Sequence, residues 1–241
     1  MHAARSAPDV QEQPRRRTGN WELPRASRFS LSKRLFDLIG SATLLFVLAP
    51  LMALVALAIT IRMPGPVFYV GVRIGRYGRP FRMFKFRSMV VDADQRGGTS
   101  TAGDDPRLTP VGQFIRRFKL DELPQLFNVL KGEMSFVGPR PQVEWAVRLY
   151  SDAEQEVLTV RPGITDPASL RFANEAEILK GASDPDQTYL ELIHPRKMQL
   201  SLDYVRHRTF WEDLKIVGRT ALAALGIASY AVDPNELKAD H

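Results

Sequence analysis

The chain has 241 residues, with 33 Lys and Arg against 27 Asp and Glu, a formal net charge of +6 and no cysteine. This length suits one domain, with or without an appended segment. The lack of cysteine excludes disulfides and Cys-ligated zinc, and the basic balance favours anionic partners, namely nucleic acid, phosphate substrates or a membrane surface.

Residues 1–30 are rich in Pro, Arg, Ser and Ala and show no helical periodicity, so they predict a disordered basic arm. The run Arg15-Arg16-Arg17 either contacts lipid headgroups or belongs to a solvated tail. Residues 1–20 contain no apolar run, so we do not expect a cleavable signal peptide.

Residues 31–62 are predicted to enter the membrane, because Leu38–Ile61 is uncharged and mostly apolar. As a straight helix this run would reach about 36 Å, enough to cross a hydrocarbon core of about 30 Å, so a transmembrane helix is one interpretation. However, Pro50 breaks the hydrogen-bond ladder near the middle, and both flanks are basic, which marks the cytoplasmic side. We therefore favour a re-entrant helix hairpin that enters and returns, with its break at Ala49 and Pro50.

Residues 63–231 are predicted to form one cytosolic α+β domain that is mainly helical, followed by a tail at 232–241. β-Branched and aromatic runs around a Gly-rich turn predict two strands, and Thr109-Pro110 matches an N-cap followed by a proline at the first helical position. The predicted elements are a short β-hairpin over Val67–Met89, a mobile loop over Val90–Gly103, and helices over Pro110–Lys119, Trp145–Val160 and Asp213–Tyr230. The last helix either lies in the membrane interface as an amphipathic helix or packs on the core.

Two adjacent acids, Asp121 and Glu122, begin the most informative stretch of the chain. Pro124 is tolerated only in the first turn of a helix, so a helix is predicted to begin near Asp121. Free N–H groups and the helix macrodipole favour negative charge there, which keeps a carboxylate ionised, as a nucleophile or a metal ligand requires. The alternative is that Asp121 is an ordinary N-cap and Glu122 an ordinary first-turn acid.

Basic side chains lie on both sides of these acids, and no acidic residue occurs between Asp37 and Asp92. The planar guanidinium of arginine suits phosphate oxygens, and a rigid Gly-Pro-Arg-Pro turn limits the backbone freedom of Arg140. Each cation is otherwise a surface charge or a member of a structural ion pair. The candidate phosphate-binding residues are Lys85, Arg87, Arg116 and Arg140.

Several longer motifs occur in a fixed order between Leu31 and Thr220. They are Lys33-Arg34-Leu35-Phe36-Asp37, Pro64-Gly65-Pro66-Val67-Phe68-Tyr69, Lys85-Phe86-Arg87-Ser88-Met89, Asp105-Pro106-Arg107-Leu108-Thr109, the stretch 121–141, and Arg161-Pro162-Gly163-Ile164-Thr165. Together they resemble the signature of the bacterial polyprenyl-phosphate sugar-1-phosphate transferases. These monotopic phosphoglycosyl transferases initiate exopolysaccharide, O-antigen lipopolysaccharide and related glycans.

The resemblance implies an enzyme that moves a sugar-1-phosphate from a nucleoside diphosphate sugar, expected to be a UDP-sugar, to undecaprenyl phosphate. Asp121 would attack the β-phosphate and hold a covalent phosphosugar, while Glu122 would serve as a metal ligand or as a base. Mg²⁺ is the implied cofactor, with Asp121 and Glu122 as its ligands. The implied location is the cytoplasmic face of the bacterial inner membrane, and a homodimer is left open.

The chain departs from the common family pattern at two places. The family usually has Ser-Pro at the hairpin break, where this chain has Ala49-Pro50, and Gly-Leu-Ala-Gln where this chain has Asp166–Arg171. The second departure bears on the sugar or nucleotide selectivity more than on the chemistry. Of the remaining acids, Asp105 is expected to cap a turn, and Asp213 to match a late aspartate of the family.

A non-catalytic membrane adaptor for glycan assembly is the alternative function. It predicts that both carboxylates are dispensable, whereas this chain retains them together with the surrounding cations. Nucleic acid is not an expected partner, because nucleic-acid binding would not explain the uncharged run over 38–61.

Overall fold

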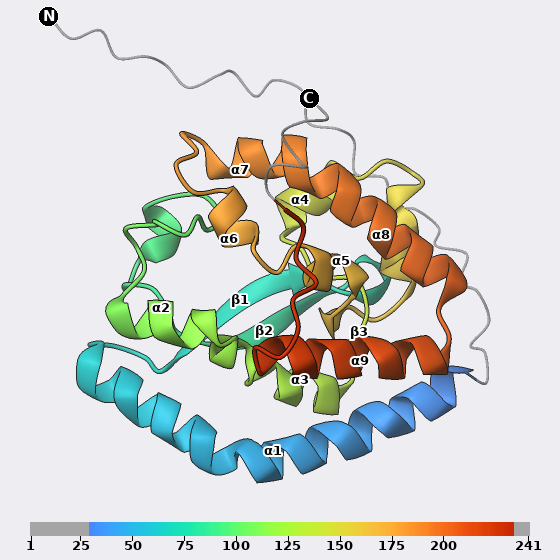
Figure 1. Cartoon of the computed structure of the whole chain (residues 1–241), viewed down its shortest axis with the longest axis horizontal. Coiled ribbons are helices and arrows are strands. Elements are labelled where there is room, and N and C mark those ends of the chain that lie inside the picture. Colours follow the sequence, from blue (N-terminus) through green and yellow to red (C-terminus); the bar gives the residue numbers. More distant parts are fainter. Residues whose placement is uncertain (1–28, 234–241) are drawn as a thin grey trace, which may run out of the picture.

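The computed structural model describes residues 29–233, so most of the predicted basic arm and most of the predicted tail lie outside the described residues. The described part is mainly helical, as predicted. Its helices are α1 (Phe29–Arg62), α2 (Pro110–Arg117), α3 (Gln125–Lys131), α4 (Glu144–Arg148), α5 (Pro167–Arg171), α6 (Glu175–Ile178), α7 (Pro185–Thr188), α8 (His194–His207) and α9 (Phe210–Ala224). Its strands are β1 (Phe68–Ile74), β2 (Pro80–Phe86), β3 (Ser135–Val137) and β4 (Gly163–Thr165). Figure 1 shows α1 along one side of the body, the β1–β2 hairpin in the middle and α8 on the opposite side.

The predicted hairpin is confirmed. β1 and β2 pair antiparallel from Phe68 opposite Phe86 to Ile74 opposite Pro80 without a skipped residue. A second, parallel pair of β3 and β4 was not predicted, because each strand has only three residues. Glycine is required where the chains flanking this pair meet, since a Cβ on Gly163 would lie 2.2 Å from the backbone nitrogen of Gly138.

The predicted helix after Thr109 is confirmed, with the Thr109 hydroxyl accepting a hydrogen bond from the Gly112 N–H. The predicted helix over 145–160 is wrong. α4 ends at Arg148, and a 3₁₀ turn follows over Glu154–Thr159. The Glu154 carboxylate accepts from the backbone N–H and the hydroxyl of Ser151, and such local polar contacts compete with a continuing helix.

α1 is one continuous helix that passes through Pro50, and it bends in Figure 1. The break expected at Ala49 and Pro50 therefore does not separate two helices in this structure. Between Leu31 and Arg62 the mean hydropathy of the most apolar 18-residue window is 2.8, and only 17% of that window is buried. By length and composition α1 is the one described helix that could cross a membrane.

The N-terminal end of α1 is fastened to the body by polar contacts. The Lys33 ammonium lies 2.5 Å from the Asp213 carboxylate in α9, and the Arg34 guanidinium donates to the carbonyls of Val129 and Leu130. These carbonyls belong to the last turn of α3, which has no helical partners for them. Asp37 is fully buried, and its Oδ1 accepts from the Ser135 hydroxyl and the Phe136 N–H, both at 3.0 Å.

The C-terminal end of α1 is fastened to the same body by apolar packing. Val55, Ile59 and Met63 are buried against Phe86 of β2 and Ile115 of α2. The principal core lies on the other side of the hairpin and is formed by residues of β2, α3, β3, α5, α8 and α9. Its buried members include Met83, Leu126, Val129, Phe136, Leu170, Tyr204 and Ile216. Both ends of α1 therefore contact one compact body, and Leu45 near its middle also packs on the principal core.

We expect Asp37→Ala to destabilise the protein, because it leaves the Ser135 hydroxyl and the Phe136 N–H buried without an acceptor. Each orphaned donor costs about 1 to 3 kcal/mol. The melting temperature in detergent micelles should fall clearly below that of the parent. Asp203→Ala is the matched control, since Asp203 is exposed and bonds only locally to His207 in α8; it should melt like the parent, and an equal loss in both variants would contradict the assignment.

Candidate active site

Asp121 and Glu122 lie in a 3₁₀ turn, Leu120–Glu122, between α2 and α3. The helix predicted to begin near Asp121 begins at Gln125, and the alternative in which Asp121 is its N-cap is wrong, because Pro124 occupies that position. Lys119 has a left-handed backbone with φ of 55° and separates this turn from α2. The two acids are consequently positioned by a tight turn between two helices.

Glu122 is held between two cations. Its carboxylate lies 3.1 Å from the Lys85 ammonium in β2 and forms a two-point ion pair with the Arg140 guanidinium beyond β3. Burial alone would raise the pKa of Glu122, but Arg140 and Lys85 hold it well below its ordinary value. Burial in turn lowers the pKa of Lys85, against the opposing effect of Glu122. Arg140 and Lys85 therefore stabilise the ionised form of Glu122.

Asp121 behaves differently from its neighbour. It is only 5% exposed, yet within the described residues its carboxylate makes no hydrogen bond and no ion pair. Burial raises its pKa, Lys85 and Arg116 oppose that rise, and the adjacent Glu122 adds to it. The sequence predicted that a helix terminus keeps Asp121 ionised. In the structure its pKa instead depends on the balance between burial, which raises it, and nearby cations, which lower it.

A cavity of about 590 Å³ opens beside Asp121. Its wall includes Asp121 and the four predicted phosphate-binding residues, which the structure thus brings together: Lys85, Arg87, Arg116 and Arg140. Glu122 is not among the described residues that line it, because its carboxylate is turned to its two cation partners. The volume lies within the range of roughly 300 to 1,000 Å³ typical of small-molecule sites.

Arg87 is buried without a carboxylate partner. Its Nη2 donates to the carbonyl of Met63 at 2.6 Å, while Nε and Nη1 have no partner among the described residues. The Pro-Gly-Pro motif makes room for it: Gly65 has φ of +108°, and a Cβ there would lie 2.4 Å from Nη1 of Arg87. Arg87 thus links the end of α1 to the cavity wall with unused donors.

Sequence reasoning missed several charged residues of the cavity wall, among them Arg73 in β1, Glu175 in α6 and Lys197 in α8. Arg73 was counted only as basic charge beside the membrane segment. The signal available for Arg73 was the alternation of side chains along β1, which places every second residue on the face that is turned inward. No sequence signal paired Glu175 with Lys197, because a distant helix brings the second residue to the first.

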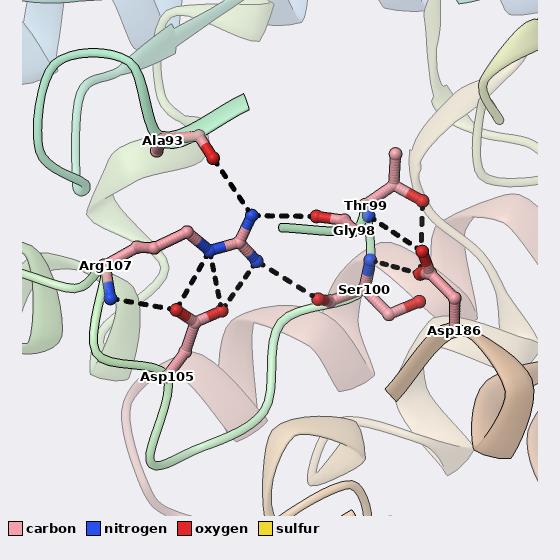
Figure 2. Close-up of polar contacts among 7 residues, drawn as sticks. All are labelled: Ala93, Gly98, Thr99, Ser100, Asp105, Arg107 and Asp186. Atoms are coloured by element: carbon pink, nitrogen blue, oxygen red, sulfur yellow. Dashed lines mark hydrogen bonds and ion pairs between the residues drawn. The ribbon is translucent and has the colours of Figure 1, made fainter. Parts of the chain in front are cut away.

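The loop that was predicted to be mobile is fastened by side chains (Figure 2). The Arg107 guanidinium donates to the carbonyls of Ala93, Gly98 and Ser100 and pairs with Asp105 at 2.7 Å. Asp186 accepts from the backbone N–H groups of Thr99 and Ser100. The expected turn role of Asp105 is confirmed, since its Oδ1 accepts from the Arg107 N–H at 2.9 Å. This loop forms one wall of the cavity.

Asp213 lies outside the cavity wall. It is 1% exposed and accepts from the Tyr204 hydroxyl at 2.6 Å as well as from Lys33. These contacts join α9 to α8 and α1, so the late aspartate is placed to hold helices together. Among the described residues, no group of three or more His, Cys, Asp or Glu side chains is placed to hold a metal ion.

Comparison with known proteins bears out the resemblance seen in the sequence. The bacterial sugar transferase family matches residues 28–226. The chain is 41% identical over 210 residues to undecaprenyl-phosphate glucose phosphotransferase of Komagataeibacter xylinus, covering 84% of this chain and 36% of that protein. It is 37% identical to undecaprenyl-phosphate galactose phosphotransferase of Salmonella typhimurium, covering 83% of this chain and 41% of that protein.

A shorter relative is UDP-glucose:undecaprenyl-phosphate glucose-1-phosphate transferase of Caulobacter vibrioides. It is 37% identical over 206 residues, which cover 84% of this chain and 73% of that protein. The chain spans about two fifths of the first two relatives. The match to the family model nevertheless covers residues 28–226, from the start of α1 to the end of α9, and this range includes every residue of the cavity wall. The chain therefore belongs to the bacterial sugar transferase family.

Proposed function

We propose that this protein transfers a sugar-1-phosphate from a UDP-sugar to undecaprenyl phosphate, giving undecaprenyl diphosphate-sugar and UMP. The observation that carries the proposal is the Asp121 carboxylate, which has no partner among the described residues in the wall of a cavity lined with cations. The names of the relatives support it, since they describe sugar phosphotransferases that act on undecaprenyl phosphate. The alternative of a non-catalytic adaptor offers no reason for such a wall.

The reaction proceeds in two displacements at one phosphorus atom. A carboxylate oxygen of Asp121 forms a bond to the β-phosphorus of the donor, the bond from that phosphorus to the bridging oxygen breaks, and UMP leaves with the electron pair. A phosphate oxygen of undecaprenyl phosphate then bonds to the same phosphorus and displaces the Asp121 carboxylate. The enzyme regains its starting state, and the sugar keeps its bond to the β-phosphate throughout.

The surrounding cations supply positioning and charge neutralisation, which dominate catalysis of phosphoryl transfer. Arg116 and Arg87 line the cavity, where their positive charges can neutralise a bound phosphate. The charges of both Glu122 and Asp121 act on the buried Lys85. Glu122 holds Lys85 and Arg140 in place. We therefore assign nucleophilic attack to Asp121 and a positioning role to Glu122, in addition to the metal-ligand or base roles inferred from the family.

Mg²⁺ fits the chemistry of these side chains. Mg²⁺ is usually bound through one or two carboxylates plus substrate phosphates and water, and the Asp121 carboxylate is free for this, with Glu122 next in the chain. When bound, the ion would neutralise charge that develops on the diphosphate. Lys85 and Arg140 already engage Glu122, so Asp121 is the more accessible of the two proposed ligands.

The way α1 is attached supports a re-entrant placement at the cytoplasmic face of the inner membrane. A straight spanning helix has its ends on opposite sides of the bilayer, whereas both ends of α1 pack on one body. Between them, apolar side chains such as Phe46 and Leu54 are exposed, 84% and 64% respectively. The bend of α1 would allow this middle part to dip into the hydrocarbon and return.

This topology predicts that both flanks of α1 face the cytoplasm. Because the chain has no cysteine, Arg25→Cys and Arg79→Cys each create a unique thiol. In intact cells neither thiol should react with a membrane-impermeant maleimide, and both should react after the inner membrane is permeabilised. Labelling of only one of them in intact cells would show that α1 spans the membrane.

Removal of divalent metal should stop turnover. In nanodiscs that contain undecaprenyl phosphate, excess EDTA should abolish UMP release from the UDP-sugar, and added Mg²⁺ should restore it. EDTA that has been saturated with Mg²⁺ beforehand is the control and should have no effect. Full activity in excess free chelator would remove the metal from the proposal.

Asp121→Asn should abolish catalysis without unfolding the protein. Within residues 29–233 the Asp121 carboxylate makes no hydrogen bond that the amide would lose, and a neutral amide cannot readily form the acyl phosphate. We expect UMP release to fall at least about a thousandfold, roughly 4 kcal/mol in transition-state stabilisation, with an unchanged melting temperature. The exposed Asp152 provides the matched control, and Asp152→Asn should keep parental activity.

The covalent step has its own measurement. The parent incubated with UDP-sugar alone should gain the mass of a sugar phosphate on the peptide that contains Asp121, and Asp121→Asn should not. An adduct mapped by fragment ions to Glu122, or near-normal turnover of the Asn variant, would contradict the assignment of the nucleophile.

A further inference from the structure

Glu175 and Lys197 form an ion pair in the wall of the cavity. The side chain of Lys197 is 12% exposed and that of Glu175 is 30% exposed, so the pair is shielded but reachable from the cavity. Burial alone would raise the pKa of Glu175, but Lys197 and then Arg140 keep it below its ordinary value. The phosphoryl transfer proposed above uses neither residue.

Neutral polar groups adjoin this pair. The Gln142 side-chain amide donates to the Tyr189 hydroxyl at 3.1 Å, and both residues line the same cavity. The Lys197 ammonium lies 5.6 Å from the centre of the Tyr189 ring. A carboxylate, an ammonium, an amide and a phenol thus offer acceptors and donors side by side, which suits a ligand group that both donates and accepts hydrogen bonds.

Arg140 connects this ion pair with the proposed reaction centre. Arg140 is shared, because its guanidinium pairs with Glu122 on one side and its charge acts on Glu175 on the other. A ligand whose phosphate lies against Arg140 would therefore place its next substituent near Glu175 and Lys197. In a nucleoside diphosphate sugar, the substituent of the β-phosphate is the sugar.

The segment in which the chain departs from the family pattern, Asp166–Arg171, contacts the helix that contributes Lys197 to this wall. Asp166 is fully buried, and its two carboxylate oxygens accept from the Ser169 N–H at 2.7 Å and from the Ser201 hydroxyl at 3.1 Å. Asp166 thereby caps α5 and fastens it to α8, the helix that carries Lys197. The names of the relatives agree in undecaprenyl phosphate and differ in glucose or galactose, so the part of the donor that varies among them is the sugar.

We propose that Glu175 and Lys197, with Gln142 and Tyr189 beside them, form the subsite that binds the hydroxyl groups of the donor sugar and selects among sugars. This inference rests on the proposed function. A sugar hydroxyl donates to the Glu175 carboxylate and accepts from the Lys197 ammonium. A site built from buried polar groups discriminates strongly, because a sugar with a displaced hydroxyl leaves those groups unpaired.

The test measures donor selectivity with the full chain in nanodiscs that contain undecaprenyl phosphate. The parent, Glu175→Gln and Lys197→Met are each assayed for kcat/KM with UDP-glucose, UDP-galactose and their 2-acetamido analogues, by release of UMP. In each protein, UDP, which lacks the sugar, is also measured as a competitive inhibitor. Glu177→Gln is the matched control, because Glu177 pairs with Lys180 on the exposed side of α6.

We expect kcat/KM for the preferred donor to fall at least about tenfold in both variants. The ratio of kcat/KM between the preferred donor and its epimer should move toward one. The inhibition constant of UDP should stay within about twofold of the parental value, and the melting temperature should stay within a few degrees of it. Glu177→Gln should retain the parental ratio. Tyr189→Phe, which removes only a hydroxyl, provides the same comparison if Glu175→Gln or Lys197→Met fails to fold.

Two results would overturn the subsite. The first is an unchanged donor ratio in Glu175→Gln, Lys197→Met and Tyr189→Phe. The second is a loss of UDP affinity as large as the loss for the UDP-sugar, which would assign the pair to the ribose or the diphosphate. A parent chain that releases no UMP from any donor would instead refute the proposed function itself, and the subsite with it.

Discussion

The ion pairs of Glu122 with Lys85 and Arg140 are the contacts on which the rest of the site depends. They join three segments that are distant in the chain: strand β2, the turn between α2 and α3, and the turn after β3. Shielding a charged carboxylate from water is costly unless it is paired, so the pairing of Glu122 holds the three segments in one arrangement. The cavity, the arginines around it and the position of Asp121 follow from that arrangement.

The same contacts separate two neighbouring acids into two roles. Glu122 and Asp121 are chemically alike and adjacent, yet the structure lowers the pKa of one and raises that of the other. Two neighbouring titratable groups whose environments push their pKa values apart usually have different roles in an active site. Here Glu122 pairs with two cations, whereas Asp121 lines the cavity and pairs with no residue in the described part of the chain.

The cavity is also connected to the proposed membrane segment. Arg87 follows β2 directly and donates to the carbonyl of Met63, immediately after α1, while its other guanidinium donors remain without partners among the described residues. If α1 lies in the membrane as proposed, this side of the cavity is the side on which the phosphate of a lipid acceptor would arrive. The sugar subsite inferred at Glu175 and Lys197 belongs to a different part of the same wall.

Local sequence determined the elements whose cause is local. Thr109-Pro110 fixed the start of α2, β-branched residues around a glycine turn predicted the β1–β2 hairpin, and an uncharged run predicted a membrane helix, because caps, turns and hydrophobicity act over a few residues. The ordered motifs also identified Asp121 and its four cations. Only the tertiary structure decided that Glu122 is paired and Asp121 is not, that α1 is fastened at both ends, and that Lys197 meets Glu175. These outcomes depend on burial and on contacts between distant segments, which spacing along the chain does not contain.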